Sequence, residues 1–143
     1  NVIPHIDIFM DDGSTKEETK MVNETKKILS ESIEVSATCV RVPTFIGHAE
    51  SINIEFINPI ALEEAINALQ TSQALKITDL EDKNLFMTPH ESVGSSEVFV
   101  SRLREDNSVA NGLNMWIVAD NLRKGAALNS IQIAETMIED GYL

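Results

Sequence analysis

The sequence lacks the features expected of an extracellular or membrane-embedded protein. Its single cysteine, Cys39, excludes a disulfide within the chain and fits a reducing compartment such as the cytoplasm. No apolar run approaches the roughly 18 residues that a membrane-spanning helix needs. No basic segment followed by an apolar one opens the chain, as it would in a secretory signal. The chain begins with Asn1 rather than Met, so this last absence is a weak indication.

Positive charge is also scarce. The chain has 11 Lys and Arg against 23 Asp and Glu, a formal net charge of −12, which disfavours nucleic acid as a partner. Any anion-binding site must therefore use a few well-placed cations. The three histidines are far apart, and no Cys or His pair has metal-ligand spacing, which disfavours a zinc site. No G-x-G-x-x-G occurs, so no dinucleotide-binding fold is expected in this chain.

What is present indicates one domain with a substantial core. Of 143 residues, 43% are hydrophobic and 24% are charged, close to the globular average. A capping box at Ser14 or Thr15 starts the first helix. Periodicity predicts helices over 15–31, 61–71 and 120–139, strands over 34–43, 50–57, 75–78, 98–103 and 113–119, and a long loop over 79–96. This order predicts an α+β fold with a mixed, mainly antiparallel sheet and helices packed on one face.

Arg41 is the first candidate for a functional role. Alternation in the 34–43 run places it on one strand face with Val35, Ala37 and Cys39. A buried guanidinium without a partner would be very costly. Arg41 therefore reaches water at the strand end, pairs with an internal carboxylate, or binds an anionic ligand.

His48, Glu17 and Lys20 are further candidates. His48 follows Gly47 in the expected turn between two strands, and an imidazole that titrates near neutrality suits general acid–base chemistry. An ordinary exposed turn histidine fits the same pattern. Glu17 and Lys20 are i and i+3 at a helix start, so they form either an exposed ion pair or two contacts to a ligand with an amine and an anionic group.

Cys39 is predicted to be a small core residue rather than a nucleophile. It lies within a Val-rich strand, whereas a reactive cysteine needs an electropositive, partly exposed setting. Gly125 and the alanines after it begin the last helix with small side chains, which allow a ligand or another domain to approach closely.

Four blocks of the sequence resemble the C-terminal half of bacterial aspartate-semialdehyde dehydrogenases. They are NVIPHID, KEETKMVNETKKIL, VSATCVRVP followed by GHAESINIEF, and WIVADNLRKGAALNSIQIAE. The resemblance covers nearly the whole chain in order, and the RVP-x-x-x-GH-x-E-S and DNLRKGAA blocks are specific. It implies the fold of a glyceraldehyde-phosphate-dehydrogenase-like C-terminal domain and identifies residues 1–143 as a substrate-binding and dimerisation domain.

The resemblance also implies a reaction. The family reversibly interconverts aspartyl 4-phosphate and aspartate 4-semialdehyde with NADP(H) and phosphate, in diaminopimelate, lysine, threonine, methionine and isoleucine biosynthesis. A cysteine thiolate forms a hemithioacetal, hydride transfer gives a thioester, and phosphate attacks it. By the same resemblance His48 is the acid–base residue, Arg41 binds the substrate carboxylate, Glu17 meets the substrate amine, and Lys20 lies at the phosphate.

Two parts of the family pattern are missing from the sequence. The nucleotide-binding domain is absent, and so is the segment with the nucleophile, since Cys39 matches a different position. The isolated chain is therefore expected to be inactive. The segment 121–132 matches a region that packs on the nucleotide domain, which makes Asn121 and Gly125 cofactor-side residues and predicts an exposed apolar surface here. A homodimer through the sheet is expected, with no nucleic-acid or membrane partner.

Two other functions remain open. An N-acetyl-glutamyl-phosphate or acyl-CoA reductase shares the two-domain plan, although an acetylated substrate has no free amine for Glu17. A non-catalytic α+β ligand-binding or regulatory domain would be favoured if Arg41 and His48 were both buried and satisfied by internal partners.

Overall fold

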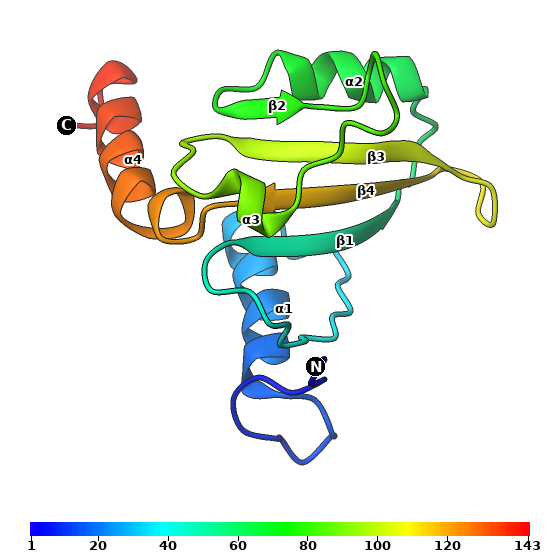
Figure 1. Ribbon diagram of the computed structural model, residues 1–143, viewed down its shortest axis with the longest axis vertical. Coiled ribbons are helices and arrows are strands. Elements are labelled where there is room, and N and C mark those ends of the chain that lie inside the picture. The colour runs from blue at the N-terminus through cyan, green and yellow to red at the C-terminus, as the bar shows by residue number, and fades with distance from the viewer. The chain divides into compact units, whose positions relative to one another are not determined.

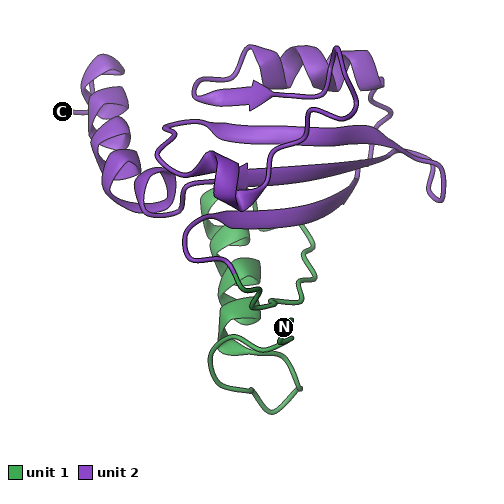
Figure 2. Ribbon diagram, in the orientation of Figure 1, with its two compact units in different colours: residues 1–43 green, residues 44–143 purple.

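The computed structural model describes all 143 residues, which divide into two compact units. The first unit is Asn1–Pro43 and the second is Thr44–Leu143, coloured green and purple in Figure 2. No helix in either unit has the length and apolar character required to cross a membrane.

The first unit is built around helix α1, Lys16–Ile28. Thr15 is its N-cap and forms the predicted capping box. The Thr15 Oγ1 accepts a hydrogen bond from Glu18 N at 3.3 Å, and the Glu18 carboxylate accepts one from Thr15 N at 2.7 Å. Glu17 and Glu18 in the first turn and Lys26 and Lys27 in the last turn complement the helix dipole.

The predicted strand over 34–43 is wrong. Apart from an isolated bridge between Ile3 and Arg41, this segment forms no ladder. Its exposure does alternate, with Val35, Ala37 and Cys39 half-buried and their neighbours exposed. Cys39 contacts α1, since its Sγ lies 3.5 Å from Met21 Sδ, and its backbone N–H donates to the side chain of Glu18 at 2.8 Å rather than to a neighbouring strand. A period of two therefore did not imply strand pairing here.

The second unit contains the sheet (Figure 1). Its strands are β1, His48–Glu55; β2, Leu75–Ile77; β3, Val98–Asp106; and β4, Gly112–Ala119, in the order β1-β4-β3-β2. The β1–β4 and β3–β4 pairs are antiparallel, and β2–β3 is parallel. The mixed, mainly antiparallel α+β fold is thus confirmed, but β1 pairs with β4 and not with residues 34–43.

One face of this sheet forms the core with helix α2, Leu62–Gln70. Ala65 of α2 is buried against Val100, Leu103, Leu113 and Met115 of the two central strands. The helix predicted over 61–71 is confirmed, and its apolar residues Leu62, Ile66 and Leu69 pack on this cluster from one face of the helix.

The long loop predicted over 79–96 is tied to the central strands. It contains a one-turn helix, α3, Pro89–Ser92. Trp116 of β4 donates its indole N–H to the Met87 carbonyl at 3.0 Å. The buried Asp79 carboxylate accepts from the backbone N–H of Arg102, which has φ 57° at a bulge in β3. The loop is therefore fixed at both its start and its middle.

The predicted last helix is present but begins with an irregular turn. A π-helical segment, Arg123–Ala127, precedes α4, Leu128–Glu139, and Gly141 follows with φ 77°. No residue of α4 is buried, and Ile131 and Ile138 remain 57% and 61% exposed. The apolar stripe of α4 is therefore uncovered, as the sequence predicted.

Candidate active site

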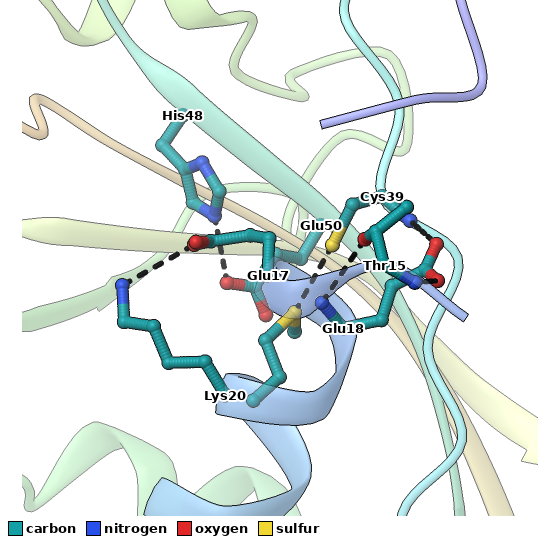
Figure 3. Close-up of polar contacts among 8 residues, drawn as sticks. Thr15, Glu17, Glu18, Lys20, Cys39, His48 and Glu50 are labelled. Atoms are coloured by element: carbon teal, nitrogen blue, oxygen red, sulfur yellow. Dashed lines mark hydrogen bonds and ion pairs between the residues drawn. The ribbon is translucent and has the colours of Figure 1, made fainter. Parts of the chain in front are cut away.

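His48 is the first residue of β1, and its side chain meets Glu50 two residues along the strand. His48 Nε2 lies 2.9 Å from Glu50 Oε1 (Figure 3). The alternation that turns Ile52 and Ile54 to the core places both side chains on the same sheet face, at the end of the strand. The imidazole is 61% exposed, so it is accessible to a ligand.

The Glu50 carboxylate is held in its charged form. The hydrogen bond from His48 lowers the pKa of Glu50 below its ordinary value, and this outweighs the opposing effect of partial burial. An ionised Glu50 in turn favours the protonated imidazole and fixes the orientation of the ring. The pair is therefore a suitable acid–base group. Glu50 has no role in the sequence-based prediction, although its i, i+2 spacing from His48 on one strand places both side chains on the same face.

Asn121 and Gly125 lie in the same unit as His48. Asn121 Oδ1 accepts a hydrogen bond from Gly47 N at 3.0 Å, directly before the histidine. Gly125 lies one turn further along, and a Cβ at Gly125 would be 3.7 Å from the Asn121 Cβ with no closer neighbour. The structure thus brings Asn121 next to the turn that carries His48.

Glu17 and Lys20 belong to the first unit and form the predicted ion pair. Lys20 Nζ lies 3.3 Å from Glu17 Oε1 (Figure 3). The hydrogen bond to Glu17 is the largest of the effects that raise the pKa of Lys20. Both side chains are accessible, 53% for Lys20 and 34% for Glu17. An exposed pair of this kind is easily opened, so either partner can exchange the other for a ligand group.

Arg41 also lies in the first unit. Its backbone pairs with Ile3, with Arg41 N donating to Ile3 O at 2.8 Å, and its side chain is exposed. The guanidinium makes no hydrogen bond or ion pair, so the alternative of an internal carboxylate partner is wrong. Neither Arg41 nor His48 is buried, which removes the condition that would have favoured a non-catalytic domain. That Arg41 and His48 line one cleft stays a prediction.

Cys39 is half-buried against α1. Its Sγ lies 3.5 Å from Met21 Sδ, and its backbone N–H is held by Glu18. This agrees with a packing role, although Cys39 is neither in a strand nor fully buried. No three His, Cys, Asp or Glu side chains come together as a group that could hold a metal ion.

Two open hollows occur in the second unit, and neither is lined by His48. The larger, of about 500 Å³, runs along α4 and includes Lys124 and Gln132. The smaller, of about 350 Å³, is lined by residues of the sheet that include Trp116, Arg102 and Arg104. The His48 side chain, which is 61% exposed, is an accessible group at the start of β1.

The chain is similar to known proteins along most of its length. The model of the semialdehyde dehydrogenase dimerisation domain matches residues 1–124. The aspartate-semialdehyde dehydrogenase of Aquifex aeolicus is 49% identical over 144 residues, which cover 100% of this chain and 42% of that protein. The corresponding protein of Bacillus subtilis is 48% identical over 139 residues, 96% of this chain and 40% of that protein.

Solved structures give the same result. The crystal structure of aspartate semialdehyde dehydrogenase II from Vibrio cholerae complexed with ASA has 47% sequence identity and a TM-score of 0.90. The match covers 98% of this chain and 41% of that one. A probable aspartate-semialdehyde dehydrogenase from Pseudomonas aeruginosa, at 28% identity, has a TM-score of 0.88. The chain spans about two fifths of the length of the relatives it matches.

The sheet, its helices and these matches define an α+β dimerisation domain of the kind found in dehydrogenases. The chain belongs to the semialdehyde dehydrogenase dimerisation-domain family, and the relatives named above are aspartate-semialdehyde dehydrogenases. The resemblance noted from the sequence is thereby confirmed.

Proposed function

We propose that this chain is the substrate-binding and dimerisation part of an NADP-dependent aspartate-semialdehyde dehydrogenase. The reaction is the reversible conversion of aspartyl 4-phosphate to aspartate 4-semialdehyde with release of phosphate, on the route to lysine, threonine and methionine. The observation that carries the proposal is the accessible His48–Glu50 pair, 2.9 Å apart, in a chain 47% identical to the Vibrio cholerae enzyme solved with ASA.

His48 is the proposed acid–base residue. It takes up the proton that the nucleophilic thiol loses. It also exchanges a proton with the substrate oxygen when the sulfur adds to the carbonyl carbon. Glu50 supports both tasks, because a carboxylate beside an imidazole favours its protonated form and fixes the ring. The thiol itself is proposed to lie outside residues 1–143, since Cys39 packs on Met21.

The cationic residues of the first unit are proposed to bind the anionic parts of the substrate. Arg41 offers an exposed guanidinium without a protein partner, and its planar fork matches a carboxylate. Lys20 is assigned to the phosphate and Glu17 to the substrate amine. Their mutual ion pair would open at little cost because both side chains are exposed.

NADP, when bound, supplies the hydride acceptor and donor. The residues of this chain fit an edge contact with it, since Asn121 keeps an exposed amide nitrogen without a hydrogen bond and Gly125 adds no side chain beside it. They do not form a phosphate-binding loop. We therefore place most of the cofactor site in a separate nucleotide-binding domain and expect residues 1–143 alone to be inactive. Homodimerisation and a cytoplasmic location belong to the same proposal.

The test uses the full-length polypeptide that carries this chain. NADPH formation from aspartate semialdehyde is followed with and without phosphate, for the wild type, His48→Ala and a matched control, His5→Ala, which changes a histidine stacked on Phe9 in the other unit. Phosphate-dependent activity should fall about 100-fold in His48→Ala and persist in His5→Ala. A wild-type protein inactive on this substrate, or an unaffected His48→Ala variant, would refute the proposal.

A further inference from the structure

Three chain segments meet at the end of the sheet where His48 begins β1. They are the turn before His48, the loop that contains α3, and the chain that leaves β4 (Figure 1). His48 is directly opposite Ala119 in the ladder, so Asp120 and Asn121 follow at the same end. The contacts among these three segments therefore set the position of the His48 backbone.

Gly47 fixes one side of this junction. It has φ 105°, a conformation that favours glycine. A Cβ at Gly47 would lie 2.6 Å from the Pro89 carbonyl oxygen and 2.8 Å from the Pro89 Cβ. The backbone before His48 therefore packs directly on α3, and no larger residue fits there.

Asn121 holds the other side. Its Oδ1 accepts the Gly47 N–H at 3.0 Å, a hydrogen bond between residues 74 positions apart. Gly47 precedes the first ladder pair, so this side chain supplies a hydrogen bond that the sheet does not. The Asn121 amide is therefore oriented with its oxygen toward the histidine turn and its nitrogen away from it.

Asp120 anchors the backbone of Asn121. Asp120 is 4% exposed, and its carboxylate accepts hydrogen bonds from Leu122 N at 2.9 Å, Arg123 N at 3.1 Å and Gly94 N at 2.8 Å. The Gly94 bond is the largest cause of the lowered pKa of Asp120. Arg123 adds a bond to Ser96 Oγ at 2.9 Å. The start of the last helical segment is thereby attached to the loop that supports Gly47.

We propose that Asn121 is a positioning residue for His48, because its amide oxygen fixes the Gly47 backbone from which the histidine enters β1. This inference rests on the proposed function above. It gives Asn121 a role that acts through its oxygen, whereas a contact with the cofactor would use its nitrogen. The two roles are separable, because aspartate retains the acceptor oxygen and loses the donor.

The first experiment compares Asn121→Ala, Asn121→Asp and the surface control Asn67→Ala in the full-length protein. We expect Asn121→Ala to lower kcat about tenfold or more, the scale of a small misplacement of a reacting group. Loss of the cofactor contact proposed for the amide nitrogen would appear separately, as a higher cofactor KM in both Asn121 variants. Asn121→Asp should recover most of the loss, and Asn67→Ala should resemble the wild type. A rise in cofactor KM alone, or a failure of aspartate to rescue kcat, would overturn the proposal.

The second experiment places Asn121→Ala in a His48→Ala background. A residue that acts through His48 causes no further loss once the imidazole is gone, whereas an independent role adds its own loss. Additive losses would therefore contradict positioning.

A third measurement does not depend on activity. In Asn121→Ala, hydrogen exchange at the Gly47 amide should accelerate and the His48 imidazole resonances should shift, while amides of α2 stay unchanged. Unchanged His48 resonances would refute positioning. If the wild type fails to oxidise aspartate semialdehyde but these resonances respond, the proposed function fails and the Asn121–His48 coupling stands.

Discussion

The two units of the chain are stabilised by different interactions. All seven buried apolar residues belong to Thr44–Leu143, where they join the central strands and α2. The one buried residue of Asn1–Pro43 is Thr15, the N-cap of α1. The second unit thus relies on the removal of apolar surface from water, and the first on capping and side-chain-to-backbone hydrogen bonds.

The residues of the proposed site are supported by different interactions in the two units. His48 and Asn121 lie on the unit with the apolar core, whereas Glu17, Lys20 and Arg41 lie on the unit without one. The first unit also exposes large apolar side chains such as Phe9, at 63%. We therefore expect the proposed acid–base pair to be held more rigidly than the proposed substrate-binding charges, since local opening is easiest where few apolar contacts are buried.

The largest expected effect comes from the core of the second unit. Leu113 is 2% exposed, so Leu113→Ala should lower the free energy of local opening of β4 by about 2–5 kcal/mol, through lost transfer energy and a cavity. Ile28 in the first unit is 75% exposed. Ile28→Ala should change the free energy of local opening of β4 by less than about 0.5 kcal/mol. Hydrogen exchange of β3 and β4 amides measures both. Equal losses of stability in the Leu113→Ala and Ile28→Ala variants would contradict the conclusion that the apolar core stabilises the second unit.

A smaller effect should follow from removal of the cap of α1. Thr15→Ala deletes the oxygen that accepts from Glu18 N and should destabilise α1 by about 1 kcal/mol. Thr15→Ser keeps the oxygen and should restore most of the stability. Amide exchange in α1 should accelerate in the alanine variant while β3 and β4 remain protected. Faster exchange in both units would show that they open together.

The smallest effect concerns Glu18 and pH. Hydrogen bonds from Cys39 N–H, the largest cause, and Thr15 N–H hold the pKa of Glu18 below its ordinary value of 4.5. A lowered folded-state pKa means that the stabilisation is fully present above the ordinary value and is lost as the pH falls through the depressed one. The Cys39 amide resonance should follow this titration.

The control for this titration is Glu24→Gln, a change at an exposed residue of the same helix. The pH response of the Cys39 amide should vanish in Glu18→Gln and persist in Glu24→Gln. A response that survives in Glu18→Gln would show that another group holds the 34–43 segment.

Much of the fold was predictable because its patterns are local. Alternation located β3 and β4 to within three residues at each end, and the capping box located the start of α1. The 34–43 segment was mispredicted for a physical reason. Its residue Cys39 contacts Glu18 and Met21 of α1, and a sequence period does not reveal whether a strand or a helix lies beside an extended chain.

The site was only partly predictable. The 17–20 spacing allowed an exposed ion pair as one of two alternatives, and the structure shows that pair. His48 was expected in a turn between two strands but is the first residue of β1, and its acid–base role stays a prediction. Glu50 was missed even though its spacing from His48 is typical of two side chains on one strand face. The hydrogen bond from Gly47 to Asn121 joins distant segments, and no local pattern predicts it.

The sequence by itself determined the α1 cap and the apolar faces of α2 and the strands. Its resemblance to known proteins gave the family and predicted the uncovered stripe of α4. Each depends on residues within a few positions of one another or on a linear match. Only the tertiary structure decided that β1 pairs with β4, that Glu18 holds Cys39, and that Asn121 holds the turn before His48. These pairings depend on how each unit packs. Many chain segments could supply the partner for a given hydrogen bond, and the packed arrangement brings only one of them close enough.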